Sequence, residues 1–149
     1  MKLSAKAEYA LIAILDMTLY AGEGPVQVKS IARRQSISVR FLEQVMASLK
    51  KAGLVESFRG AQGGYVLSKK SEEINLAEVL QAIDGPFGQV ETATNHDGFQ
   101  APQSVRGVID EIWGEVTNSL VHILTTVTLQ ELCERKRKMD REHVLMYHI

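Results

Sequence analysis

The sequence predicts a mainly helical fold in which a short β hairpin follows three helices and a long helix lies toward the C-terminal end. Three observations support this class. Apolar residues recur at steps of three and four along several segments, as on the buried side of a helix. A glycine-rich stretch at Arg59–Gly64 separates two short runs of strand character. The periodic segment Ser104–Arg135 is much longer than a small head needs.

The first two helices are expected at Ser4–Ala21 and Val28–Gln35. A broad apolar band runs along the first, and Gly22 and Gly24-Pro25 end it. The segment Val26–Val28 is expected to form a short strand that completes a three-stranded sheet. The second helix then starts immediately, and a turn leads into the third.

The third helix begins at Ser38, whose hydroxyl can accept a hydrogen bond from a free N–H of the first turn. Gly53 ends it after two lysines that suit the negative end of the helix dipole. Its apolar face is formed by Phe41, Leu42, Val45, Met46 and Leu49. The other face is rich in long donors and acceptors, which can read base edges in a DNA major groove.

Two strands follow at Leu54–Phe58 and Tyr65–Leu67, so the order of elements is that of a winged helix-turn-helix. Arg59 stands at the tip of the wing, where it can enter a narrow minor groove. The glycine run lacks the GK[ST] ending of a phosphate loop and joins two strands, which argues against nucleotide binding. The candidate DNA-binding residues are Ser38, Arg40, Glu43, Gln44, Lys50, Lys51, Arg59 and Gly60.

The charge of the chain is divided between its two halves. The net charge is −1, but residues 1–70 hold 11 Lys and Arg against 5 Asp and Glu, whereas residues 71–149 hold 6 against 13. A basic front half and an acidic back half fit a DNA-binding head joined to a body that faces partners. Chance clustering of charge in a neutral protein is the alternative.

The back half is expected to contain a helix at Leu76–Ile83, a long loop at Gly85–Pro102 and a helix of about 48 Å at Ser104–Arg135. The spacing of apolar residues along the long helix is close to that of a coiled-coil seam. The apolar stripe is wider than one chain can cover, which predicts an antiparallel or crossed homodimer. The β-branched run Thr125–Thr128 lowers its helix propensity, and the tail Val144–Ile149 is expected to pack back on the head. The candidate dimer-interface residues are Ile109, Ile112, Trp113, Val116, Leu120, Ile123 and Val127.

These features divide the chain into a winged head at 1–71, a linking helix and sensor-region loop at 72–103, and a dimerisation helix with its tail at 104–149. Together they resemble the Rrf2 family of bacterial transcription regulators over essentially the whole chain. The resemblance is carried by Leu3-Ser4, Glu8–Leu11, Ile31-Ala32, Phe41–Gln44, Leu49–Val55, Arg59–Tyr65 and Leu80–Gly85.

The resemblance implies a homodimer that is held by a long C-terminal helix and binds a palindromic operator. It also implies that Glu43 and Gln44 touch bases and that Arg59 enters the minor groove. Arg40 stands where many members carry Tyr or another residue, which indicates a distinct operator sequence.

Cysteine content separates this chain from many members of that family. Many relatives hold an iron–sulfur cluster with three cysteines in the loop before the dimerisation helix, because iron in such clusters takes thiolate ligands. The corresponding loop here, Gln89–Val105, has none, and Cys133 is the one cysteine of the chain. An unusual relative recruits a Glu at the position of Glu8, but without loop cysteines we predict no cluster, no other metal site and no cofactor.

The sequence therefore predicts a homodimeric, sequence-specific DNA-binding regulator of transcription; a repressor is favoured, and an activator is the alternative. The alternative is a protein-interaction module controlled by a partner protein, in which DNA binding is secondary; a regulatory protein or a small-molecule effector would be a further partner. No motif of an enzyme is found. A single cysteine and the lack of a signal peptide or a bilayer-spanning run predict a cytoplasmic protein without membrane contact.

Overall fold

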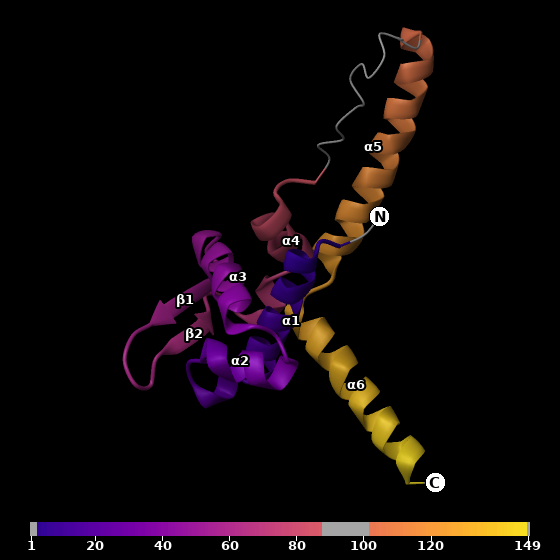
Figure 1. Ribbon diagram of the computed structural model, residues 1–149. Helices are drawn as coiled ribbons and strands as arrows, with labels where there is room; N and C mark the ends of the chain where they lie inside the picture. Colours follow the sequence, from indigo (N-terminus) through magenta and orange to yellow (C-terminus); the bar gives the residue numbers. More distant parts are fainter. Residues whose placement is uncertain (1–2, 88–101, 149) are drawn as a thin grey trace.

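The computed structural model describes residues 3–87 and 102–148. Figure 1 shows a head built from the first four helices and a β hairpin, from which two further helices leave in different directions. The elements are α1 (Ala5–Leu19), the 3-10 turn η1 (Ala21–Glu23), α2 (Val28–Gln35), α3 (Val39–Lys51), β1 (Val55–Phe58), β2 (Gly64–Leu67), the 3-10 turn η2 (Ser71–Glu73), α4 (Leu76–Asp84), α5 (Gln103–Thr126) and α6 (Leu129–Tyr147).

The core of the head lies where α1 meets α2, α3 and α4. Each fully buried side chain of this size contributes about 1.5–3 kcal/mol by leaving water, so the apolar faces predicted from helical spacing hold the head together. The largest buried side chains of these four helices are Ile14, Met17, Ile31, Leu42, Val45, Met46, Leu49 and Val79.

The helix-turn-helix has the predicted bounds and the predicted cap. Helix α2 spans Val28–Gln35, and Ser36 then adopts the left-handed conformation with φ of 54°. The hydroxyl of Ser38 accepts a hydrogen bond of 3.1 Å from the N–H of Phe41 and so begins α3. The turn therefore fixes the angle at which α3 leaves α2 and presents its polar face.

The wing contains two strands, not three. Strands β1 and β2 pair antiparallel, with Val55 opposite Leu67 and Phe58 opposite Gly64. The predicted strand at Val26–Val28 is wrong, because only Val26 pairs with the sheet, through two 2.8 Å backbone hydrogen bonds to Tyr65. The next residue, Gln27, already precedes α2, so the chain leaves the sheet after one bridge.

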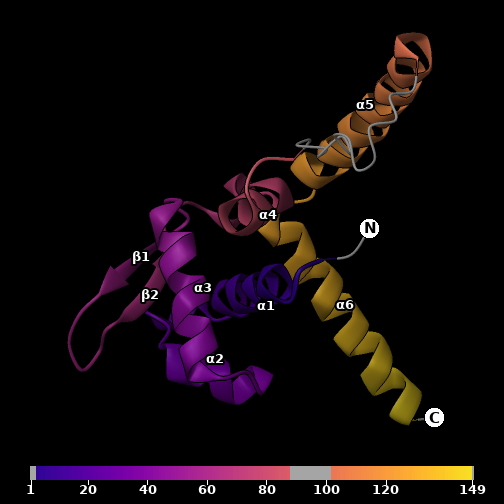
Figure 2. The ribbon, with the colours of Figure 1, turned by 45° about the horizontal axis from the view of Figure 1, so that its top comes forward.

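The predicted continuous helix at Ser104–Arg135 is also wrong. Helix α5 ends at Thr126, after 24 residues or about 36 Å, and α6 begins at Leu129. Figure 2 shows the two helices diverging from a common junction beside α4. Val127 belongs to this junction rather than to the helical stripe to which the sequence pattern assigned it.

The break has a tertiary cause. The backbone at Val127 and Thr128 is extended and pairs with the segment before α4: the Leu76 N–H donates to the carbonyl of Val127 at 3.0 Å, and the Leu129 N–H donates to the carbonyl of Ile74 at 2.9 Å. Thr128 also caps α6 by accepting from the Glu131 N–H. The sequence Thr128-x-x-Glu131 is a typical helix start and is the local signal that could have revealed the break.

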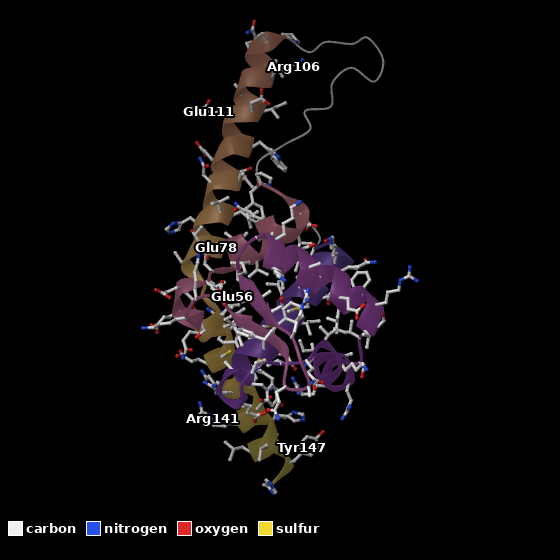
Figure 3. All side chains as sticks on the ribbon, turned by 90° about the vertical axis from the view of Figure 1, so that its left-hand side faces the viewer. Glu56, Glu78, Arg106, Glu111, Arg141 and Tyr147 are labelled. Atoms are coloured by element: carbon white, nitrogen blue, oxygen red, sulfur yellow. The ribbon has the colours of Figure 1, made fainter. Side chains whose placement is uncertain are left out.

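The C-terminal segment does not pack back on the head as predicted. Helix α6 packs on α1 through its first turns, where Leu129 and Cys133 are buried, and then continues to Tyr147. Figure 3 shows Arg141 and Tyr147 on the projecting part of α6, at the opposite end of the molecule from Arg106 and Glu111 on α5. The exposed fractions there are 54% for Val144, 65% for Leu145 and 77% each for Met146 and Tyr147.

Within the described ranges, none of the helices combines the length and the apolar character that crossing a bilayer requires.

Candidate nucleic-acid interface

The polar face of α3 is exposed along its length. Leu42, Val45, Met46 and Leu49 turn into the core, which leaves the other side of the helix open to solvent. Four of the residues assigned to this face by the sequence pattern are exposed there: Arg40, Glu43, Gln44 and Lys51. They provide one guanidinium, one carboxylate, one amide and one ammonium group, which is the donor and acceptor mixture that base edges require.

Two other assigned residues have structural contacts as well. The Ser38 hydroxyl is occupied by the cap of α3. The Lys50 ammonium donates to the Ser57 hydroxyl at 2.6 Å and thereby ties the C-terminal end of α3 to β1. Both residues lie at the edges of the α3 surface, where they hold it in place relative to the turn and the wing.

Arg59 and Gly60 lie in the exposed loop between β1 and β2. Gly60 has φ of 107°, which non-glycine residues rarely adopt. At the base of the loop, a Cβ added to Gly64 would lie 2.6 Å from the Val26 carbonyl oxygen, and one added to Gly63 would lie 2.4 Å from that of Phe58. These close approaches hold the base of the wing against the chain before α2, and Arg59 projects from it.

Phe58 is a wing residue that the sequence pattern did not single out. It precedes Arg59 directly, is 52% exposed and lies opposite Gly64, which has no side chain to cover the ring. An exposed phenyl group beside Arg59 can contact the sugar edge of a groove. The available signal was an aromatic residue at the last position of a strand that joins a glycine-rich loop.

A buried ion pair connects α1 to α2. Asp16 is 1% exposed, and its carboxylate accepts hydrogen bonds from Arg34 Nε at 2.9 Å, Arg34 Nη2 at 2.6 Å and Gln35 Nε2 at 2.9 Å. The guanidinium carbon of Arg34 also lies 3.9 Å from the centroid of the Tyr20 ring, a cation–π distance. This cluster fixes α2, and with it the start of α3, on the body of the head.

The C-terminal half presents a second exposed surface, the α5 face. Its apolar side chains recur every three or four residues along one side of α5. Each has about half of its surface in solvent: Val105 (49%), Val108 (61%), Ile109 (60%), Ile112 (52%), Trp113 (51%), Val116 (45%) and Ile123 (58%). Leu120 continues the stripe and is half-buried. A continuous apolar surface of this kind is typical of a protein–protein interface.

Cys133 belongs to neither surface. It lies on α6, is 1% exposed, and its burial raises the pKa of the thiol. A buried thiol that holds its proton is a poor nucleophile and a poor metal ligand. Among the residues that the structure describes, no group of three or more His, Cys, Asp or Glu side chains is arranged to hold a metal ion.

Comparison with known proteins identifies the family. The family model Rrf2, described as an iron-dependent transcriptional regulator, matches residues 3–135. The chain belongs to the Rrf2 family.

Curated Rrf2 relatives are similar along almost their full length. The transcriptional regulator IscR of Photorhabdus laumondii is 37% identical over 141 residues, which cover 94% of this chain and 84% of the relative. The transcriptional regulator CymR of Bacillus subtilis is 33% identical over 132 residues, which cover 89% of each chain.

Solved Rrf2 structures show the same fold. CymR, the global cysteine regulator of B. subtilis, superposes with a TM-score of 0.76 at 32% identity and covers 91% of this chain and 98% of its own. IscR of T. potens superposes with a TM-score of 0.73 at 34% identity and covers 91% and 88%. The mainly helical, winged fold and the Rrf2 membership are thereby confirmed. The protein is a DNA-binding transcription regulator and not an enzyme.

Proposed function

We propose that this protein acts as a homodimer that binds a pseudo-palindromic operator in double-stranded DNA and represses transcription. The observation that carries the proposal is the pair of exposed surfaces on one chain: a polar face on α3 that continues into the wing, and the apolar α5 face. The first fits duplex DNA, and the second fits a copy of itself. The proposed division of the chain assigns DNA binding to the head at 1–71 and dimerisation to the segment at 104–149, with a linking segment at 72–103.

In this proposal α3 lies in the major groove and the wing follows the adjacent minor groove. Two copies of α3 related by a twofold axis would contact successive major grooves about 34–36 Å apart. Glu43, Gln44 and Arg40 then face base edges, whereas Lys51 and the wing lie near phosphates. Repression requires nothing beyond DNA binding, because a dimer bound to an operator that overlaps a promoter excludes RNA polymerase sterically. The protein should therefore silence a reporter gene whose promoter overlaps the selected operator.

Replacing Arg59 by alanine is expected to weaken operator binding about tenfold and leave the fold unchanged. The side chain is exposed, so its loss removes a contact in the minor groove without opening the core. The measurement is fluorescence anisotropy on an operator recovered by selection from random DNA. Arg141→Ala on α6 is the matched control and should bind as the parent protein does; an unchanged dissociation constant for Arg59→Ala would contradict the wing assignment.

Replacing Glu43 by alanine is expected to relax the choice of bases while it largely preserves affinity. A carboxylate contributes little attraction to DNA, but it can accept a hydrogen bond from the N4 amino group of cytosine. It disfavours bases that present only acceptors at that position. Selection from random DNA followed by sequencing should return a consensus with one or more degenerate positions in each half-site. If the consensus is identical to that of the parent protein, Glu43 does not read bases.

We further propose that this Rrf2 member functions without a conventional iron–sulfur cluster. The support is chemical: such clusters take cysteine thiolates, the chain has one cysteine, and that cysteine is buried on α6 with its proton held. Glu8 is exposed on α1 and provides a carboxylate, not a thiolate. The residues therefore do not fit the group that the family description suggests.

Protein purified without oxygen is accordingly expected to be colourless and to contain far less than one iron per chain. Selection-derived operator DNA should be bound equally well before and after treatment with an iron chelator. Visible absorption bands that bleach in air, together with loss of operator binding on chelation, would reverse this part of the proposal.

A further inference from the structure

A polar depression of about 390 Å³ lies at the root of the wing, between the turn that follows α1, helix α2 and the loop of the hairpin. The side chains that matter for its chemistry are those of Tyr20, Glu23, Gln27, Ser30, Arg34 and Gln62. This volume falls in the lower part of the range of small-molecule sites in proteins. It is separate from the polar face of α3 and from the α5 face.

Two side chains of opposite charge line this depression. Arg34 reaches it from α2, and 30% of its side chain remains exposed although Asp16 holds two of its nitrogens. Glu23 reaches it from the turn, and its side chain is exposed. The hydrogen bonds that Arg34 donates to Asp16 are the main cause of its raised pKa, and the negative charge of Glu23 adds a smaller contribution.

The remaining polar groups of the depression are neutral. Gln27 and Gln62 contribute amides, and Ser30 contributes a hydroxyl. The amide of Gln27 donates to the carbonyl of Ala61 at 3.4 Å and so connects the start of α2 with the wing loop. Such groups bind a polar, uncharged substituent through paired donors and acceptors.

We propose that this depression binds a small zwitterion, a free amino acid or a derivative that keeps both charges, as an effector. The ligand carboxylate pairs with the guanidinium edge of Arg34, its ammonium pairs with Glu23, and its side chain meets the amides and the hydroxyl. A simple anion would be repelled by Glu23, and a simple cation would leave the remaining donors of Arg34 unpaired, since Asp16 accepts only from its Nε and Nη2. The pair of charges therefore selects a dipolar ligand over either ion alone.

The position of the site couples it to DNA binding, and this step rests on the proposed operator contacts. The ligand would touch three segments at once: the turn after α1, α2 and the wing loop, of which α2 and the loop are joined by the hydrogen bond from Gln27 to Ala61. A ligand that bridges them changes the stiffness and the angle of the wing relative to the helix-turn-helix. Because Arg59 lies in that loop, occupancy changes how the wing meets the minor groove.

Three matched probes test the site in the absence of DNA. L-Glutamine carries both charges and an amide; 4-carbamoylbutanoate lacks the ammonium, and 4-aminobutanamide lacks the carboxylate. Titration of ¹⁵N-labelled protein should show saturable amide shifts at Glu23, Ser30 and Gln62 with L-glutamine, with half-saturation between about 0.1 and 10 mM for a ligand of this size. Each single-charge probe should bind at least tenfold more weakly.

Substitutions at exposed positions test whether L-glutamine binds in this depression without disturbing the fold. Glu23→Gln removes the carboxylate at an exposed position and should weaken L-glutamine binding at least fivefold, whereas Glu72→Gln, a matched change on η2, should not. No saturable shift for any probe, or equal binding of 4-carbamoylbutanoate, overturns the zwitterion site. Saturating L-glutamine should also change the dissociation constant for the operator at least threefold. Saturable binding of L-glutamine without that change overturns the effector role. In that case, normal operator binding by the ligand-free protein still supports the proposed function.

Discussion

Introducing a glutamate at Ile112 is expected to convert the protein into a monomer and to lower operator affinity about a hundredfold or more. Ile112 lies in the middle of the α5 face and is 52% exposed in the single chain. In a dimer the new carboxylate would be buried among apolar side chains without a partner, which costs several kcal/mol. Loss of the dimer removes the second half-site contact, and linking two binding modules typically contributes a factor of 10²–10⁴.

Light scattering during size-exclusion chromatography and anisotropy on the selected operator measure the two effects. Asn118→Glu provides the matched control, because Asn118 is exposed on α5 away from the apolar stripe. It adds the same charge and should leave both the mass and the affinity unchanged. A dimeric Ile112→Glu protein would show that another surface joins the subunits.

Replacing Arg34 by methionine is expected to reduce the free energy of unfolding by about 3 kcal/mol. The substitution preserves most of the stem of the side chain but removes two of the three hydrogen bonds to the buried Asp16 carboxylate. The cation–π contact with Tyr20 is also lost. An ionised group left in the core without its partner costs far more than the pair contributes when it is intact.

Urea denaturation followed by circular dichroism measures this loss. Arg33→Met is the control, since Arg33 is the exposed neighbour on the same helix and surface substitutions usually change stability by less than 0.5 kcal/mol. A loss below about 1 kcal/mol for Arg34→Met would mean that Gln35 and water satisfy Asp16 adequately.

The head could be predicted from sequence because its signals are local. The cap at Ser38, the spacing of Leu42, Val45 and Leu49, and the glycines around the wing each act within a few residues. Their consequences for the polar face of α3 follow directly, since a helix that buries one side exposes the other. The bounds of α2 and the position of Arg59 in a hairpin loop therefore needed no tertiary information.

Several of the features that sequence patterns missed are set by contacts between distant segments. The end of α5 is set by pairing of Val127 and Thr128 with residues near Asn75, about fifty positions earlier in the chain. Asp16 and Arg34 each look like ordinary surface charges in isolation, and only the packing of α2 on α1 brings them together. The contact of Lys50 with Ser57 likewise requires the hairpin to fold over the end of α3.

The tight packing at the base of the wing has a consequence for how regulators of this type diverge. Gly63 and Gly64 cannot acquire a side chain without displacing the backbone at Phe58 or Val26. Substitutions at these two positions are therefore not tolerated. Ala61 and Gln62, which directly precede Gly63 in the loop, are exposed and can be replaced without displacing the backbone. Within the wing, variation in how the loop meets DNA should therefore arise at these two positions, and the wing part of a mutational library is best confined to them.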